Sequence, residues 1–177
     1  MKQPLRILFL FVATLFAVNA YAGVNKKYIQ RTAAGESVFF IDVQKMPGIN
    51  GTKGNLKYDY TYAQPTDSVA LLMSVVLDKA AHQLFCTATF DGGEYRQKCE
   101  IIYVKPKGDK FEYRLRIYMP FNVFAEMYAS LNPLVISIDD TKGTTLSFGY
   151  KPNKWQTNSR DINTIIEIIK INTGKTE

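Results

Sequence analysis

Both cysteines of this 177-residue chain, Cys86 and Cys99, flank a segment with two glycines at its centre, CTATFDGGEYRQKC. If Gly92 and Gly93 form a two-residue hairpin loop, which glycines favour, Cys86 lies directly opposite Cys99. Hydrogen-bonded and non-hydrogen-bonded residue pairs alternate along the two strands, starting from the loop. The two cysteines fall at a non-hydrogen-bonded pair, where Cα atoms approach to about 4.5 Å. That separation is at the short end of disulfide reach. The sequence therefore predicts a disulfide, with two buried free thiols as the alternative.

Other reactive side chains are few. A structural zinc site takes four ligands, and the chain adds only one histidine, His82, to its two cysteines. Asp139 and Asp140 are adjacent in a turn-like segment, whereas glycosidase carboxylates face each other about 5–10 Å apart across the substrate. Aspartates in turns commonly bond the turn backbone instead. We therefore predict no catalytic residue, no metal and no cofactor.

A ladder of tyrosines is the first candidate for binding. Tyr58, Tyr60 and Tyr62 alternate with polar residues, so on a strand they share one face. Such aromatic rings can stack on sugars or other flat ligands. A face that also carries Leu56 is more often part of a core, and that interpretation is the more common one.

A basic cluster is the second candidate. It consists of Arg96, Lys98, Arg114 and Arg116. If the two segments are neighbouring strands, the four cations share one exposed face. Glutamates are interleaved with them, at Glu94, Glu100 and Glu112. A salt-bridged sheet surface of the ordinary kind is the more common origin of such a pattern.

The elements that must position these residues are mostly strands. Segments rich in β-formers or alternating in polarity recur between turn residues, which is typical of an all-β domain. They are 37–43, 56–63, 111–119, 134–138 and 145–150, together with the cysteine hairpin. We predict an antiparallel sandwich or partly closed barrel of about eight strands. The apolar run at 69–77 is assigned as a strand; a helix over 68–81 would make the domain α+β.

Two helices are expected beside the sheet. Pro120 suits the start of a short helix near 121–131, in which apolar residues recur at helical spacing up to Leu131. A C-terminal amphipathic helix is predicted from the isoleucines at 162, 165, 166 and 169. Ser159 or Asn158 is the expected cap at its start, and Gly174 is expected to end it.

The first 22 residues have the order of a secretory signal peptide: a basic start, an apolar run and Ala-Tyr-Ala before the cut. Residues 23–177 are then one β-rich domain. The signal segment contains two of the 22 basic residues and none of the 16 acidic ones, so cleavage lowers the net charge from +6 to +4. Because no run of four basic residues occurs, nucleic acid is not expected as a partner.

These observations predict an exported, periplasmic or secreted, non-enzymatic binding or interaction module, with an assembly of the cell envelope as one setting. Its partner is an unknown protein, glycan or apolar ligand, and the mature chain has no transmembrane segment. The alternative is a carrier of an apolar small molecule inside a β-barrel. A secreted hydrolase with distant carboxylates is the least favoured interpretation.

Overall fold

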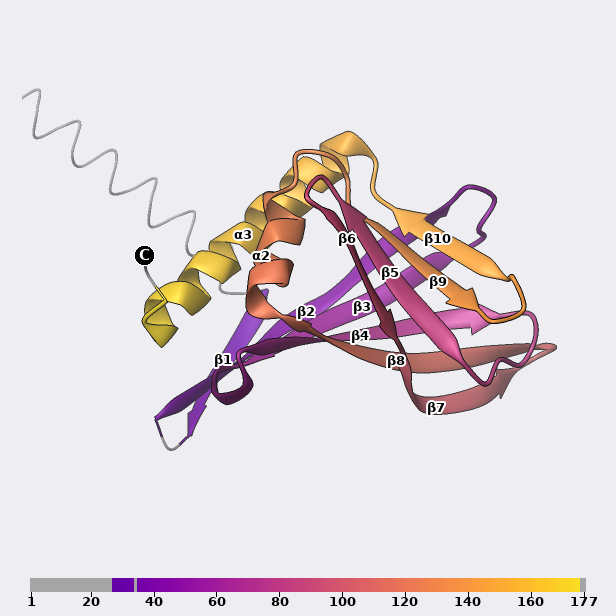
Figure 1. Ribbon diagram of the computed structural model, residues 1–177, viewed down its shortest axis with the longest axis horizontal. Helices are drawn as coiled ribbons and strands as arrows, with labels where there is room; N and C mark the ends of the chain where they lie inside the picture. The colour runs from indigo at the N-terminus through magenta and orange to yellow at the C-terminus, as the bar shows by residue number, and fades with distance from the viewer. Residues whose placement is uncertain (1–26, 34, 176–177) are drawn as a thin grey trace, which may run out of the picture.

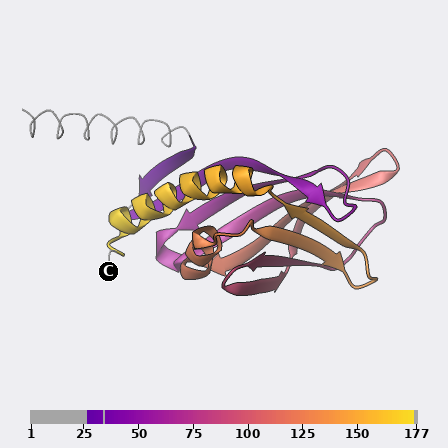
Figure 2. The same ribbon diagram turned by 90° about the horizontal axis from the view of Figure 1, so that it is seen from above.

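The computed structural model describes residues 27–33 and 35–175. The predicted signal peptide at 1–22 lies outside the described residues. The chain is mainly β, and it forms a strongly curled antiparallel sheet with two helices lying against each other at one end (Figures 1 and 2). The predicted fold class is confirmed, with ten strands in place of about eight.

The strands are β1 (Tyr28–Ala33), β2 (Glu36–Ile49), β3 (Asn55–Ala63), β4 (Ser68–Leu77), β5 (Leu84–Phe90), β6 (Gly93–Lys98), β7 (Glu100–Lys107), β8 (Lys110–Pro120), β9 (Val135–Asp140) and β10 (Thr145–Gly149). The helices are α2 (Phe121–Ala129) and α3 (Pro152–Thr173), and a 3-10 turn, η1 (Gln64–Thr66), joins β3 to β4.

The sheet curls until its two ends meet. The strand order is β6-β5-β9-β10-β2-β3-β4-β8-β7, and β1 pairs with the first half of β2. The end strands β6 and β7 are consecutive in the chain, separated by Cys99 alone. Beside them, the Tyr95 hydroxyl donates to the Tyr118 carbonyl (2.9 Å), and the Tyr118 amide donates to Gln97 Oε1 (3.1 Å). The molecule is therefore a partly closed barrel.

The apolar run at 69–77 is a strand, as predicted. β4 pairs with β3 on one side and with β8 on the other, which places it in the middle of the larger half of the sheet. Its inward residues, among them Leu71 and Met73, are fully buried, and its outward residues are mostly half-buried. A central strand has little exposed surface on either face, which accounts for a continuous apolar sequence. The α+β alternative is wrong.

The interior is filled by large side chains. The largest fully buried ones are Trp155, Tyr58, Tyr60, Tyr62, Tyr113, Tyr128, Phe39, Phe124, Met46, Leu56, Leu71 and Met73. Helix α2 contributes two of the rings, and Tyr60 packs against both, with centroid separations of 4.8 Å to Phe124 and 5.9 Å to Tyr128. The helices thus complete the core at the end of the barrel that they cover.

Both predicted helices exist, but one boundary of each differs. Helix α2 ends at Ala129, before Leu131, because the amides of Leu131 and Asn132 donate to the Asp91 carboxylate instead of continuing the helix. Helix α3 begins at Pro152, earlier than the predicted caps at Asn158 or Ser159. Proline is favoured in the first turn, and the isoleucine stripe covers only the later turns. Gly174 ends α3 with φ 70°, as expected.

The register of the cysteine hairpin differs from the prediction. Cys86 lies opposite Gln97, Phe90 lies opposite Gly93, and the Cys99 amide donates to the Leu84 carbonyl (2.8 Å). The loop is therefore Asp91-Gly92, and direct opposition of the cysteines is wrong by two residues. The reason is tertiary: Asp91 must sit at the tip of the hairpin to reach the loop after α2. A shift of two keeps each side chain on its face, so both cysteines still point inward.

Candidate functional site

The predicted tyrosine ladder lies in the core. Tyr58, Tyr60 and Tyr62 are fully buried, so they offer no exposed face on which a sugar ring would stack. Tyr60 and Tyr128 share a hydrogen bond between hydroxyls (2.9 Å), and Tyr58 shares one with Tyr150 (2.8 Å). Burial raises the pKa of Tyr58 and of Tyr60 well above 10.0. Both therefore stay protonated and serve the packing of the barrel.

The predicted basic cluster is largely neutralised. Its arginines pair with carboxylates as Arg96–Asp139 (2.6 Å), Arg114–Asp59 (2.5 Å) and Arg116–Glu100 (2.8 Å). Of its members, only Lys98 makes no ion pair within residues 27–33 and 35–175. Strands β6 and β8 are not hydrogen-bonded neighbours, so the four cations do not form one continuous row. The salt-bridged surface is the better description.

The two cysteines are buried free thiols in the structure. Their offset makes them diagonal neighbours, whose Cα atoms in antiparallel pairs lie about 7–8 Å apart, beyond the usual disulfide range. A bond between them would need a register shift of two residues, and the disulfide stays a prediction. Burial raises the pKa of Cys99 to about 12 and that of Cys86 well above 9.0. As thiols, both are therefore expected not to react in the folded protein.

The remaining reactive candidates have structural surroundings. Asp139 pairs with Arg96, and Asp140 accepts hydrogen bonds from the amides of Lys142 (2.8 Å) and Thr144 (2.9 Å) in the turn after β9. His82 is exposed in the connection between β4 and β5. Within the described part of the chain, no three side chains among His, Cys, Asp and Glu gather as a metal site would require.

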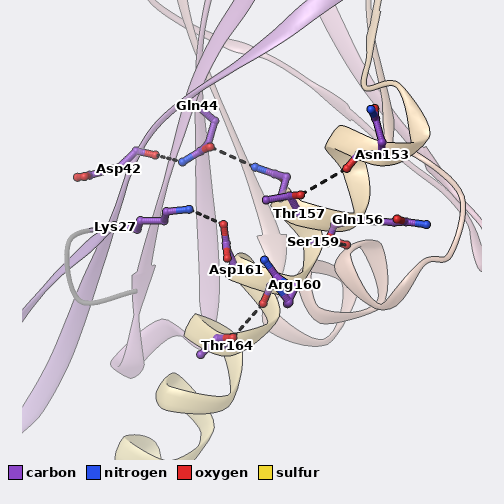
Figure 3. Close-up of polar contacts among 11 residues, drawn as sticks. Lys27, Asp42, Gln44, Asn153, Gln156, Thr157, Ser159, Arg160, Asp161 and Thr164 are labelled. Carbon is purple, nitrogen blue, oxygen red and sulfur yellow. Dashed lines mark hydrogen bonds and ion pairs between the residues drawn. The ribbon is translucent and has the colours of Figure 1, made fainter. Parts of the chain in front are cut away.

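A groove between α3 and β2 brings together side chains that the sequence did not single out as candidates for binding. We call it the basic groove; its volume is about 400 Å³. It is lined by Lys27, Gln44, Lys45, Pro47, Tyr150, Lys151, Lys154, Thr157, Asn158 and Asp161. The lining residues come from the residue before β1, the second half of β2, the connection from β10 to α3 and the first turns of α3. Figure 3 shows Lys27 and Gln44 extending from the sheet side toward α3.

Positive charge dominates the basic groove. Four lysines line it against one acid, Asp161, which forms an ion pair with Lys27. Lys45, Lys151 and Lys154 make no ion pair with any residue that the structure describes. The first turn of α3 adds the positive end of the helix dipole on the same side. Three lysines that make no ion pair among the described residues thus line one groove.

The floor and far wall of the basic groove are polar but neutral. The Tyr150 hydroxyl is hydrogen-bonded to buried Tyr58, and its ring stacks on Trp155 at 6.3 Å between centroids. Asn158 Nδ2 donates to Gln44 Oε1 (3.1 Å), and Gln44 Nε2 donates to the Asp42 carbonyl (3.1 Å; Figure 3). These contacts fix the wall of α3 against β2, so the lysines extend from a rigid frame.

Sequence reasoning missed the basic groove because its lysines come from distant parts of the chain. Lys27 precedes β1 and Lys45 belongs to β2, whereas Lys151 and Lys154 precede and open α3. No run or spacing connects them. The only local signal is KPNK, residues 151–154, where proline at a helix start carries a lysine on each side.

No protein-family description, curated protein or solved structure matches this chain significantly. Among the described helices, none is both long enough and apolar enough to cross a membrane.

Proposed function

We propose that this chain is an exported, non-enzymatic binding module that holds an anionic ligand in the basic groove. The observation that supports it is that one groove is lined by three lysines without an ion pair among the described residues, Lys45, Lys151 and Lys154. Like charges held together repel one another, and an anion that bridges them relieves that repulsion. Export is proposed from the predicted signal peptide, with Gly23 as the expected mature N-terminus.

The ligand that suits the basic groove carries phosphate or carboxylate groups on a polar frame. Lysine ammonium groups bind phosphate as point charges, and Thr157, Asn158 and Tyr150 add neutral hydrogen-bonding groups between them. An acidic glycan or an acidic segment of an envelope protein has this chemistry. Because the groove is open to water, its affinity should fall steeply with salt.

The test is a titration of the purified protein with an acidic polysaccharide, polygalacturonate, at low and at physiological salt, followed by calorimetry. Neutral dextran is the ligand control. The double variant Lys151→Ala/Lys154→Ala should bind polygalacturonate about 10-fold more weakly, from two exposed charge interactions. Lys98→Ala removes an equally unpaired lysine on β6 and should change nothing. Absence of binding at low salt, or an equal loss in Lys98→Ala, would contradict the proposal.

The carrier alternative has less support. A carrier needs an enclosed apolar space, whereas the barrel interior is occupied by tyrosine, tryptophan, phenylalanine and methionine side chains. The grooves named here lie at the surface of the molecule and are open to water. The filled interior and the charged exterior both favour recognition of a polar partner from outside.

A further inference from the structure

The loop that joins α2 to β9 holds an exposed leucine in a fixed position. Leu131 is 89% exposed, the highest value among the large apolar residues that the structure describes. Asp91, at the tip of the β5–β6 hairpin, accepts hydrogen bonds from the amides of Leu131 (2.7 Å) and Asn132 (2.9 Å). The Asn132 side-chain amide donates to the same carboxylate (2.5 Å). A contact made by Leu131 would therefore cost little loop ordering.

The same loop is also anchored to the core. The Asp91 amide donates to Ser130 Oγ (3.1 Å), and Trp155 Nε1 donates to the Ser130 carbonyl (3.0 Å). Trp155 is buried in the first turns of α3 and stacks on Tyr128 of α2 at 5.4 Å between centroids. The hairpin tip, the loop and both helices thus form one rigid unit beneath Leu131.

A second groove lies beside Leu131. We call it the α2–α3 groove; its volume is about 590 Å³, and Leu131 stands at its rim. Its walls are the end of α2 and one face of α3, and the lining residues besides Leu131 are Tyr128, Ala129, Ser130, Ser159, Arg160, Asn163, Thr164 and Glu167. Positions 160, 163, 164 and 167 follow the spacing of a single helix face. A protruding apolar side chain and a hollow therefore occupy one patch of surface.

The charges of this patch are of both signs. Arg160 makes no ion pair with any described residue, and Glu167 on the same helix face has a side chain 63% exposed. Glu167 contacts Lys170 of its own helix at 2.9 Å, a surface pair of little energetic weight. A two-fold symmetric contact brings each residue of a patch against a different residue of the same patch. One cation and one anion, two helical turns apart, suit that arrangement.

We propose that the α2–α3 groove is a dimer interface in which each copy of this chain inserts its Leu131 into the groove of the other. Arg160 of each copy then faces Glu167 of its partner. An isolated exposed leucine needs no explanation. The proposal rests on a fixed leucine, an adjoining hollow and a self-complementary charge pair on one face. The basic groove uses other residues, so a dimer would present two anion-binding sites and bind a repeating anionic ligand with avidity.

The first test measures association of the full purified protein by sedimentation equilibrium from about 1 µM to 1 mM, the range of weak complexes. We expect a monomer–dimer equilibrium. Leu131→Asp removes two buried leucines per dimer and should weaken association about 100-fold or more, whereas Leu131→Met should retain it. The control is Ile171→Asp, which alters an exposed apolar residue outside the groove, on α3. Ile171 is 61% exposed, and its replacement should have no effect on association.

A charge exchange then identifies the occupant as a second copy. Arg160→Glu should abolish association by placing like charges opposite each other, and Arg160→Glu/Glu167→Arg should restore it. A monomer throughout the concentration range, or a dimer insensitive to Leu131→Asp, would overturn the proposal. Failure of the double variant to restore the dimer would also overturn it, since another partner of this face would not compensate for both changes.

Discussion

Among the described residues that line the basic groove, Asp161 is the single acidic one, and its ion pair with Lys27 competes with any bound anion. Replacing Asp161 by asparagine removes the negative charge and frees a fourth lysine. We expect Asp161→Asn to raise affinity for polygalacturonate about 2- to 5-fold, the size of one exposed charge interaction. Calorimetry at low salt measures the change.

Asp139→Asn is the matched control, because Asp139 pairs with Arg96 and is not part of the groove lining. It should leave affinity unchanged. Weaker binding by Asp161→Asn would mean that the carboxylate positions the groove rather than competing within it.

Asp91 joins a hairpin tip to the loop after α2. Hydrogen bonds from the Asn132 backbone and side chain lower the pKa of Asp91 from 3.8 to about 2. The folded state therefore binds this proton less readily than the unfolded state, so the contribution to stability is complete above pH 4 and is lost as the pH falls through 2. Asp91→Asn should lower the unfolding temperature at pH 7.

The difference between Asp91→Asn and the parent protein should then shrink as the pH falls from 4 toward 2, which thermal unfolding across that range measures. Asp109→Asn, in the exposed turn between β7 and β8, serves as the control and should leave the unfolding temperature unchanged. A difference that stays constant down to pH 2 would assign the effect of Asp91→Asn to packing instead of to charge.

The reactivity of the two cysteines tests the register of the β5–β6 hairpin. Burial raises the pKa of Cys99 to about 12, and Cys86 lies in contact with Met73, Sγ to Sδ 3.8 Å. We expect no reaction of the folded protein with a thiol reagent at pH 8. After unfolding without reductant, two thiols would support the hairpin register of the structure. No thiol would support the predicted disulfide and a register shifted by two residues.

Among the elements, α3 is held to the core by Trp155 of its first turn. Trp155 is 1% exposed, stacks between Tyr128 and Tyr150, and donates to the Ser130 carbonyl. Trp155→Ala should lower the free energy of unfolding by about 3–5 kcal/mol. Trp155→Phe keeps a ring but leaves the carbonyl without its donor, and should cost about 1–3 kcal/mol. Urea unfolding of both variants measures the two effects, and a stability of Trp155→Phe equal to that of the parent protein would argue against a separate role for the hydrogen bond.

An element can be predicted from the sequence when its own residue pattern specifies it, and not when distant contacts do. Strand β3 and the isoleucine turns of α3 carry their determinants in their own periodicity, so the sequence alone identifies them. The start of α3 and the hairpin register depend on tertiary contacts, through Trp155 in the core and Asp91 on the loop. Local patterns contain no information about such contacts.

Candidate sites are even harder to predict from local sequence patterns than strands and helices are. The tyrosine ladder and the arginine cluster stood out because their members are close in sequence. Proximity in sequence places residues on one strand face, and such a face either enters the core or meets carboxylates on adjacent strands. The basic groove is assembled from the first strands and the last helix, so only the fold brings its lysines together.

At the scale of the whole molecule, closure of the barrel depends on side chains. Strand β7 pairs with β8 only as far as Arg116, and beyond that point Gln97 and Tyr95 bond the Tyr118 backbone. Gln97→Ala should speed hydrogen exchange at the Tyr118 amide about 2- to 10-fold, the effect of one hydrogen bond. The Arg114 amide, within the β7–β8 ladder, should keep its rate. Equal acceleration at both amides would indicate general loosening instead of an opened closure.

The shortest pairing in the barrel, between β2 and β10, has a consequence for the order of events in folding. It joins Gly48 to Phe148 and Ile49 to Ser147, and it is the pairing that spans most of the chain. The hairpins β3–β4, β5–β6, β7–β8 and β9–β10 close small loops and gain their contacts early. Formation of the β2–β10 pairing has the entropy cost of closing a large loop, and it gains only two residue pairs. The barrel should therefore assemble as preformed ribbons that join here last, and under stress it should part first at this junction.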